Sequence, residues 1–247
     1  MTFRIYGSLM LEVLQNKGQI AQARQELRGR GISFTESLFR SRLRRLHLVR
    51  GIAVGDHVKS WDVLSTLTWI ESHLQRDEPI LDIGCYASEV ILALHKLGYS
   101  NLTGIDLNPH LEYMPYSNSI RYVHGDFMHT QFESGSFKAV TSISVIQHGY
   151  DRQALLKETS RLLAPGGFFI ASFDYWPEKI DTSGVRFFDM DWMIFSTQDV
   201  DRLVDEAREY GLFPAGELHH NSHEKAIDFG GRKYTFGWLV LQKAART

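Results

Sequence analysis

The sequence predicts an α/β protein: a doubly wound, seven-stranded, mostly parallel sheet that ends in an antiparallel hairpin and follows an N-terminal helical cap. Three observations predict this fold. Residues 1–75 carry helical patterns without a convincing strand, short β-rich runs alternate with helices from residue 79 onward, and two strand-like stretches follow one another near the C-terminal end. We therefore divide the chain into a helical cap, residues 1–75, and a sheet domain, residues 76–247.

Five β-rich runs form the predicted parallel part of the sheet. They are PILDIG, NLTGID, IRYVHGD, FKAVTSISVI and GGFFIASFDY. The helix between the first two runs has Leu94 and Leu97 on its apolar face. A second helix begins near Asp151 and ends before Pro165. Repeated strand–helix–strand units require parallel pairing, with helices on both faces of the sheet.

The C-terminal part has a different pattern. A helix is predicted to begin at Ser196, whose hydroxyl can cap it, and to end at Gly211. Residues 212–219 and 233–242 read as strands with only turn-rich residues between them. Two consecutive strands without an intervening helix pair antiparallel, which predicts the closing hairpin.

The composition excludes several classes of protein. The residues are 43% hydrophobic and 23% charged, as in ordinary globular proteins. No run of 18 apolar residues predicts a membrane span, and the first residues lack a signal-peptide pattern. Cys85 is the single cysteine, which excludes an internal disulfide framework and is predicted to be a small buried residue. These features predict a cytoplasmic protein without a membrane partner; they do not predict an oligomeric state.

Positive charge is concentrated near the N-terminus. Residues 1–60 contain 11 Lys and Arg against 4 Asp and Glu, although the whole chain carries a net charge of −2. Within residues 28–50, the apolar side chains follow helical spacing: Leu38, Phe39, Leu43 and Leu46. Two interpretations remain open. The arginines form a solvated helix face, or they bind an acidic partner such as a phosphorylated substrate or nucleic acid.

Candidate binding residues stand where the predicted strands end. In an open parallel sheet, ligands bind beyond the carboxyl ends of the strands. Asp82 and Gly84 close the first strand, and Gly84 lets a ligand approach because it lacks a Cβ. Asp106 ends the second strand and can accept hydrogen bonds from ribose hydroxyls, and Asp126 follows the third strand beside Phe127. The alternative is structural: Asp82 and Asp106 would then only accept hydrogen bonds within turns.

The motifs D-I-G-C, G-I-D, G-D-F, FKAVTSISVIQH and L-L-A-P-G-G occur in that order. Together they resemble the class I (Rossmann-like) S-adenosylmethionine-dependent methyltransferases, over residues 75–245. The resemblance implies that the first loop holds the methionyl part of the cofactor, that the second-strand acid holds the ribose and that the next acid reads the adenine. The implied cofactor-binding residues are Asp82, Gly84, Tyr86, Asp106, Leu107, Asp126, Phe127 and Ser144.

A dinucleotide-binding dehydrogenase is the nearest competing class. Its first loop needs further glycines so that a pyrophosphate can rest on the following helix. This chain has Tyr86 and Ser88 there. S-adenosylmethionine has no phosphate, so the methyltransferase interpretation tolerates the loss. Tyr86 either stacks along the methionyl chain or blocks it, and we expect it to stack.

The candidate catalytic residues follow the fourth and fifth strands. His148 is the first choice for a base that removes a proton from a hydroxyl acceptor. Asp174 and Tyr175 would line the acceptor side after the fifth strand. The competing interpretation is that His148 packs beside the cofactor or caps a helix, and that Asp174 and Tyr175 only pack under a loop.

Some chemistries are disfavoured. Pyrimidine-carbon methylation needs a cysteine beyond the fourth strand, where this chain has none. The usual motif for exocyclic base amines is replaced there by Ile146-Gln147-His148. Some quinone-pathway relatives bind a metal through carboxylates where Ser144 and Gln147 stand here, and we predict no metal site. The histidines near residue 220 do not change that prediction: His219, His220 and His223.

We therefore predict a methyltransferase acting on a small molecule or a saccharide, at oxygen in preference to nitrogen. The N-terminal helices should cover the cofactor, with His57, Lys59, Ser60 and Trp61 in that cover. One alternative is a methyltransferase for RNA or an acidic protein, which would dock on the arginine-rich stretch. The other is a non-catalytic module that binds S-adenosylmethionine.

Overall fold

The computed structural model describes residues 9–36, 42–44, 46, 48, 51–187 and 189–245. The chain folds into two compact units. The middle unit spans Lys17–Gln131, and the outer unit combines the N-terminal segment up to Asn16 with residues 132–247. The boundary predicted between residues 75 and 76 stays a prediction.

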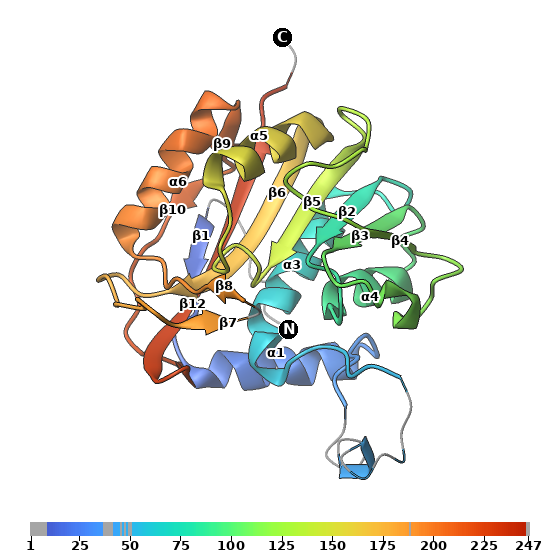
Figure 1. Ribbon diagram of the computed structural model, residues 1–247, viewed down its shortest axis with the longest axis horizontal. Coiled ribbons are helices and arrows are strands. Elements are labelled where there is room, and N and C mark those ends of the chain that lie inside the picture. Colours follow the sequence, from blue (N-terminus) through green and yellow to red (C-terminus); the bar gives the residue numbers. More distant parts are fainter. Residues whose placement is uncertain are drawn as a thin grey trace. The chain divides into compact units, whose positions relative to one another are not determined.

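The middle unit contains three parallel strands and the helices that precede or connect them (Figure 1). Its elements are α1 (Lys17–Gly29), η1 (His57–Lys59), α3 (Ser60–His73), β2 (Ile80–Ile83), α4 (Glu89–Lys96), β3 (Leu102–Asp106), η2 (Leu111–Tyr113) and β4 (Arg121–His124). Strand β3 pairs in parallel with both β2 and β4. All four residues of β2 are buried, as expected of a strand covered on both faces.

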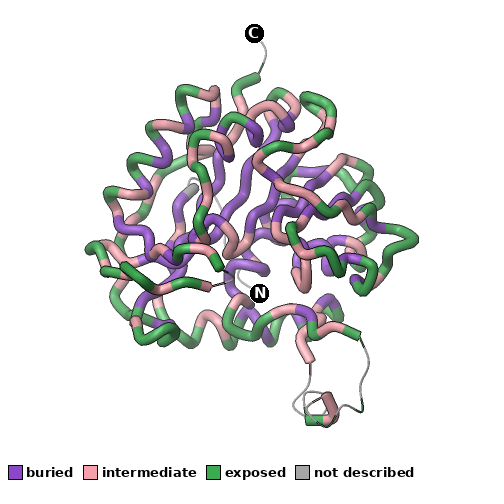
Figure 2. The backbone as a smooth tube through the Cα atoms, in the orientation of Figure 1, coloured by how far each residue is buried: buried purple, intermediate pink, exposed green. Residues whose placement is uncertain are grey.

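The outer unit holds the other half of the predicted strand–helix pattern. Its elements are β1 (Leu9–Val13), β5 (Phe137–Ile143), α5 (Arg152–Leu162), β6 (Leu163–Tyr175), β7 (Arg186–Phe187), β8 (Met190–Asp191), α6 (Thr197–Glu209), β9 (Leu212–Pro214), β10 (Glu217–Leu218), β11 (Ile227–Phe229) and β12 (Arg232–Lys243). Strands β5 and β6 are parallel, and β12 runs antiparallel to β6 over eight paired positions from Thr235 to Gln242. The two long strands β6 and β12 form the buried centre of the unit (Figure 2).

The predicted fold class is confirmed. The runs expected to be parallel strands are β2, β3, β4, β5 and β6. The expected antiparallel end is present as well, because β9 pairs antiparallel with β12, with Pro214 opposite Leu241. Two strands that we did not predict, β1 and β11, also pair with β12.

The prediction of no strand before residue 75 is wrong. Residues Leu9–Val13 form β1, which pairs antiparallel with β12 and places Leu11 opposite Leu239. Leu11 and Val13 are buried and Glu12 between them is half-buried, so the segment alternates as a strand does. The segment has only five residues, and its pairing partner lies at the other end of the chain, so the strand could not be read from the sequence.

The arginine-rich stretch is only partly described. Leu38 and Phe39 lie outside the described residues, so the predicted helix cannot be followed through them. Leu43 lies in a helical turn at residues 42–44, and the side chain of Leu46 is 66% exposed. None of the helices in the described ranges is long and apolar enough to cross a membrane.

Helix α6 begins as the sequence predicted. The Ser196 hydroxyl accepts a hydrogen bond from the Asp199 N–H at 3.3 Å. In return the Asp199 carboxylate accepts from the Ser196 N–H at 2.9 Å, which completes a capping box. Two N–H groups at the start of the helix are thereby satisfied.

Replacing Ser196 with Ala should lower the free energy of unfolding by about 1 kcal/mol, because the cap is lost and the Asp199 N–H has no replacement partner. Urea unfolding followed by far-UV circular dichroism measures this. Gln198→Ala, an exposed change in the same helical turn, is the matched control and should leave the unfolding midpoint unchanged. Equal midpoints for the two variants would contradict the capping role.

Candidate active site

The loop after β2 turns at Gly84. Gly84 has a φ of 70°, a left-handed conformation that glycine adopts without strain. Its N–H and that of Cys85 both donate to the carbonyl of Ile105, at 2.9 and 3.3 Å. The turn is therefore anchored to the end of the neighbouring strand β3.

The second half of this loop keeps a defined shape without further glycines. The Tyr86 N–H donates to Asp106 Oδ2 at 2.9 Å. Ala87 adopts a φ of 61°, and its N–H donates to the Met114 sulfur at 3.2 Å. For a residue with a Cβ, this backbone costs about 1 kcal/mol. Ser88 then caps α4 by accepting from the Val90 N–H.

Asp106 is the acid that links the two strand ends. Its Oδ1 accepts from the Asn108 N–H at 2.8 Å, while Oδ2 accepts from Tyr86. The structural role that we considered as an alternative is therefore real, since Asp106 does cap the turn that follows it. A carboxylate has about four acceptor positions, so two remain for a ligand such as a diol. The adjacent Leu107 is 51% exposed.

Asp126 follows β4 and is partly open. Its Oδ1 accepts from the Met128 N–H at 2.8 Å, and Oδ2 lies 3.4 Å from His129 Nδ1. The Asp126 side chain remains 40% exposed, whereas Phe127 is buried. The pair combines an accessible carboxylate with a fixed aromatic ring.

Two residues at the end of β2 and the start of the first loop are buried. Asp82 is 1% exposed, and Cys85 is fully buried. Burial, with smaller contributions from the charges of Asp82 and Asp106, raises the pKa of the Cys85 thiol far above its ordinary value. The thiol therefore stays protonated, which confirms the prediction of a small buried residue and excludes a thiolate nucleophile there.

Ser144 begins the segment after β5, in the outer unit. It has a φ of 57°, and its N–H donates to the carbonyl of Ser172 at 3.0 Å. His148 follows in the same segment and is half-buried. Its backbone forms an isolated antiparallel bridge with Trp192, and its ring lies edge-on to Phe187 with centroids 6.3 Å apart.

Asp174 and Tyr175 end β6 as buried residues. The carboxylate of Asp174 accepts a hydrogen bond from the indole N–H of Trp192 at 2.8 Å. The Tyr175 hydroxyl donates to the carbonyl of His220 at 2.8 Å and lies 2.9 Å from the Thr197 hydroxyl. Burial raises the pKa of Tyr175. Its hydroxyl is occupied within the fold, which favours a packing role for Tyr175 over catalysis.

A cavity of about 180 Å³ lies beside the segment after β5. It is lined by Ile146, Gln147, Gly149, Tyr150, Arg152, Asp191 and Met193. Within the described part of the chain, the buried Gln147 Oε1 and the buried Tyr150 hydroxyl have no hydrogen-bond partner. This cavity could not be predicted from the sequence, since Asp191 and Met193 are distant in the chain from its other wall and carry no motif.

The structure thus groups the predicted residues by unit. Asp82, Gly84, Tyr86, Asp106, Leu107, Asp126 and Phe127 belong to the middle unit, whereas Ser144, His148, Asp174 and Tyr175 belong to the outer unit. The first loop and Asp106 are brought into direct contact. The roles of these residues stay predictions. Among the described side chains, no three His, Cys, Asp or Glu residues could share a metal ion.

Residues 81–171 match the family model described as a methyltransferase domain. This range runs from β2 to β6 and includes the first loop and all three strand-end acids. The match supports the resemblance to the class I S-adenosylmethionine-dependent methyltransferases over these residues. The resemblance stated from the sequence is confirmed.

Known proteins similar to this chain match only part of its length. It is 31% identical over 107 residues to a demethylmenaquinone methyltransferase of Staphylococcus haemolyticus, covering 40% of this chain and 45% of that protein. It is 32% identical over 98 residues to the sterol 24-C-methyltransferase erg6 of Aspergillus fumigatus, covering 36% of this chain and 26% of that protein. The matched segment spans less than half the length of either relative.

Solved structures show the same fold at lower identity. The [4+2]-cyclase SpnF superposes with a TM-score of 0.61 at 15% identity, over 78% of this chain and 85% of that one. A putative sarcosine dimethylglycine methyltransferase from Galdieria sulphuraria gives 0.55 at 18% identity, over 84% and 98%. The fold of this chain is thus shared by proteins whose names describe different reactions.

A side chain at Gly104 should disturb the first loop. A Cβ built on Gly104 would lie 2.7 Å from the Cys85 sulfur and 2.8 Å from its Cβ. Gly104→Ala should therefore lower the free energy of unfolding by about 1–3 kcal/mol, because the fully buried Cys85 must move. Urea unfolding measures the change.

Gly125→Ala is the matched control, since a Cβ there would meet only Ile105 Cδ1 at an ordinary 3.7 Å. Its unfolding midpoint should stay within error of the wild type. If Gly104→Ala were equally harmless, close packing between β3 and the first loop would not be a constraint on this domain.

Proposed function

We propose that this protein transfers the methyl group of S-adenosylmethionine to a small molecule, at an oxygen atom. One observation carries the proposal: the Tyr86 N–H joins the first loop to the Asp106 carboxylate at 2.9 Å. A methyl donor with a methionyl chain and a ribose needs a loop for the chain and an acceptor for the hydroxyls, side by side. Both lie within the matched methyltransferase domain.

The residues fit this cofactor. Gly84 leaves room for close approach, and Asp106 keeps acceptor positions for two ribose hydroxyls after its two backbone contacts. Asp126 and Phe127 offer a partly exposed carboxylate and a ring for the adenine. When bound, S-adenosylmethionine supplies an electrophilic methyl group on a sulfonium; the protein supplies orientation, which can contribute several kcal/mol.

The cavity in the outer unit supports a small acceptor. Its volume of about 180 Å³ is similar to that of cavities that hold a single ring. Gln147 Oε1 needs a donor, and burial raises the pKa of Tyr150 so that its hydroxyl remains a donor. A ring that carries a hydroxyl group could satisfy both, after a small side-chain adjustment that exposes them. The names of the relatives also point to small acceptors, a demethylmenaquinone and a sterol.

His148 is the proposed base. A hydroxyl acceptor must lose its proton, and an imidazole can take it near neutral pH. The backbone of His148 is fixed by the bridge to the backbone of Trp192, and the indole of Trp192 donates to Asp174, so both proposed residues contact one residue. Asp174 would then hold Trp192 beside the acceptor. Tyr175 would stabilise the end of β6 through its buried hydroxyl contacts.

Asp106→Ala should weaken S-adenosylmethionine binding by about 10- to 100-fold, because hydrogen bonds to a charged group are lost. Isothermal titration calorimetry measures this. Asp77→Ala, an exposed change in the same unit, is the control and should bind as the wild type does. A wild-type chain that binds no S-adenosylmethionine would exclude the proposed function, and full affinity in Asp106→Ala would show that the ribose contact is misplaced.

His148→Ala should reduce methyl transfer by about 10²- to 10⁴-fold while leaving cofactor affinity unchanged. The assay uses cell extract, methyl-labelled S-adenosylmethionine and separation of small molecules from macromolecules. Label should appear in the small-molecule fraction. Label found only in RNA or protein would favour the macromolecular alternative, whereas cofactor binding without any transfer would favour a non-methylating use of the fold, as the name of the cyclase neighbour suggests.

A further inference from the structure

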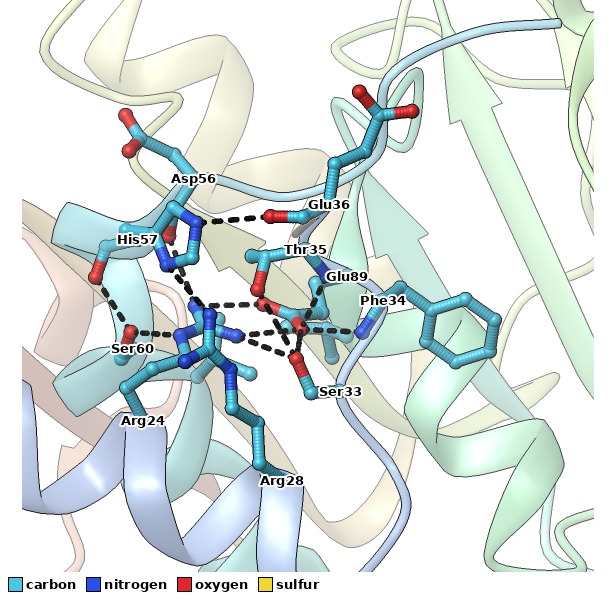
Figure 3. Close-up of polar contacts among 12 residues, drawn as sticks. Arg24, Arg28, Ser33, Phe34, Thr35, Glu36, Asp56, His57, Ser60 and Glu89 are labelled. Atoms are coloured by element: carbon cyan, nitrogen blue, oxygen red, sulfur yellow. Dashed lines mark hydrogen bonds and ion pairs between the residues drawn. The ribbon is translucent and has the colours of Figure 1, made fainter. Parts of the chain in front are cut away.

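Glu89, the first residue of α4, has a buried carboxylate that accepts five hydrogen bonds (Figure 3). Its side chain is 1% exposed. Arg24 donates to both oxygens, at 2.8 and 3.1 Å. The Ser33 hydroxyl donates at 3.1 Å, and the N–H groups of Phe34 and Thr35 donate at 2.7 and 3.3 Å. The carboxylate thus fastens α1 and residues 33–35 to the start of α4.

Arg24 completes this cluster, because all five of its N–H groups have acceptors. Two of them bind Glu89. The other three donate to the Ser60 hydroxyl at 2.7 Å, the Ser33 hydroxyl at 2.9 Å and the Asp56 carbonyl at 3.1 Å. A guanidinium presents its donors in a rigid fork, so this set of contacts fixes positions as well as charge. The start of α3 and the segment before it are held by the same side chain.

The cluster reaches the cofactor loop through Gly55. A Cβ built on Gly55 would lie 3.0 Å from Glu89 Oε2 and 3.0 Å from Thr35 Cγ2, so the glycine backbone packs directly on the ion pair. The Gly55 N–H donates to the carbonyl of Ala87 at 2.9 Å. Ala87 is the non-glycine residue of the loop with a left-handed backbone, a conformation that persists only where its surroundings hold it.

We propose that Glu89, through its pairing with Arg24, is a positioning residue for the cofactor. It holds Gly55 in place, Gly55 fixes the carbonyl of Ala87, and Ala87 keeps loop 84–88 in its binding shape. This inference rests on the proposed function, since the loop is the one assigned to the methionyl chain. A buried ion pair adds little net stability over an apolar pair, and its value here is the geometry it imposes.

The first test needs no cofactor. In Glu89→Gln the amide replaces one acceptor oxygen with an N–H₂ donor that faces other donors, so the cluster should loosen. Hydrogen exchange at the Gly55 amide should become at least about tenfold faster, in the range of ordinary local opening, while amides of β2 keep their wild-type rates. Equal protection of the Gly55 amide in both proteins would overturn the proposal.

The second test is a calorimetric cycle with S-adenosylmethionine on the wild type, Glu89→Gln, Ala87→Gly and the double variant. Glu89→Gln should bind about tenfold more weakly, a typical strength of coupling between sites. Glycine adopts the loop conformation without strain, so Ala87→Gly in the same chain should restore most of the affinity. A structural role alone predicts no such rescue, and a double variant as weak as Glu89→Gln would overturn the proposal.

Glu71→Gln is the matched control. Glu71 in α3 pairs with Arg30, which directly follows α1, and neither residue is among the atoms nearest a Cβ built on Gly55. It should bind S-adenosylmethionine as the wild type does. If Glu89→Gln does not fold, Arg24→Lys can replace it, because lysine retains the charge but has three donors in place of five. This variant should also speed hydrogen exchange at the Gly55 amide and weaken S-adenosylmethionine binding. A wild type that does not bind S-adenosylmethionine would exclude the proposed function, whereas a wild type that binds it with the same affinity as Glu89→Gln would overturn only the positioning role.

Discussion

The hydrogen bond from the Tyr86 N–H to the Asp106 carboxylate is the constraint on which the candidate site depends. It exists because β2 and β3 pair in parallel with Ile83 opposite Ile105, which brings both strand ends to one edge. The same register lets the Ile105 carbonyl accept from Gly84 and Cys85. One strand pairing therefore sets the shape of the first loop and the place of the acid that faces it.

The loop achieves this shape in a way that suits a cofactor without phosphate. Dinucleotide sites place a pyrophosphate at a helix N-terminus, where N–H groups and the helix dipole favour negative charge. In this protein the first residue of α4 is Glu89, whose own carboxylate occupies that environment and is neutralised by Arg24. The absence of later glycines and the buried Glu89 carboxylate thus both disfavour a pyrophosphate at the start of α4. This is consistent with the match of residues 81–171 to a methyltransferase domain.

The segments that follow β5 and β6 are organised around Trp192 rather than around the predicted residues themselves. Its backbone bridges His148 and its indole donates to Asp174, so one buried residue holds both segments. Tyr175 lies beside Asp174 in the sequence but faces other partners, since successive residues in a strand point to opposite faces. Its contact with the His220 carbonyl could not be read from the motif in which it occurs.

The sequence by itself determined the order of strands and helices, the antiparallel end and the acids at the strand ends, because each of these is a local pattern of period, cap or turn. Only the tertiary structure decided that Leu9–Val13 is a strand, because its partner β12 is distant in the chain. The same holds for the contact between Arg24 and Glu89, which are 65 residues apart. Long-range partners are selected by packing and by the need to satisfy buried polar groups, and neither leaves a periodic trace in the sequence.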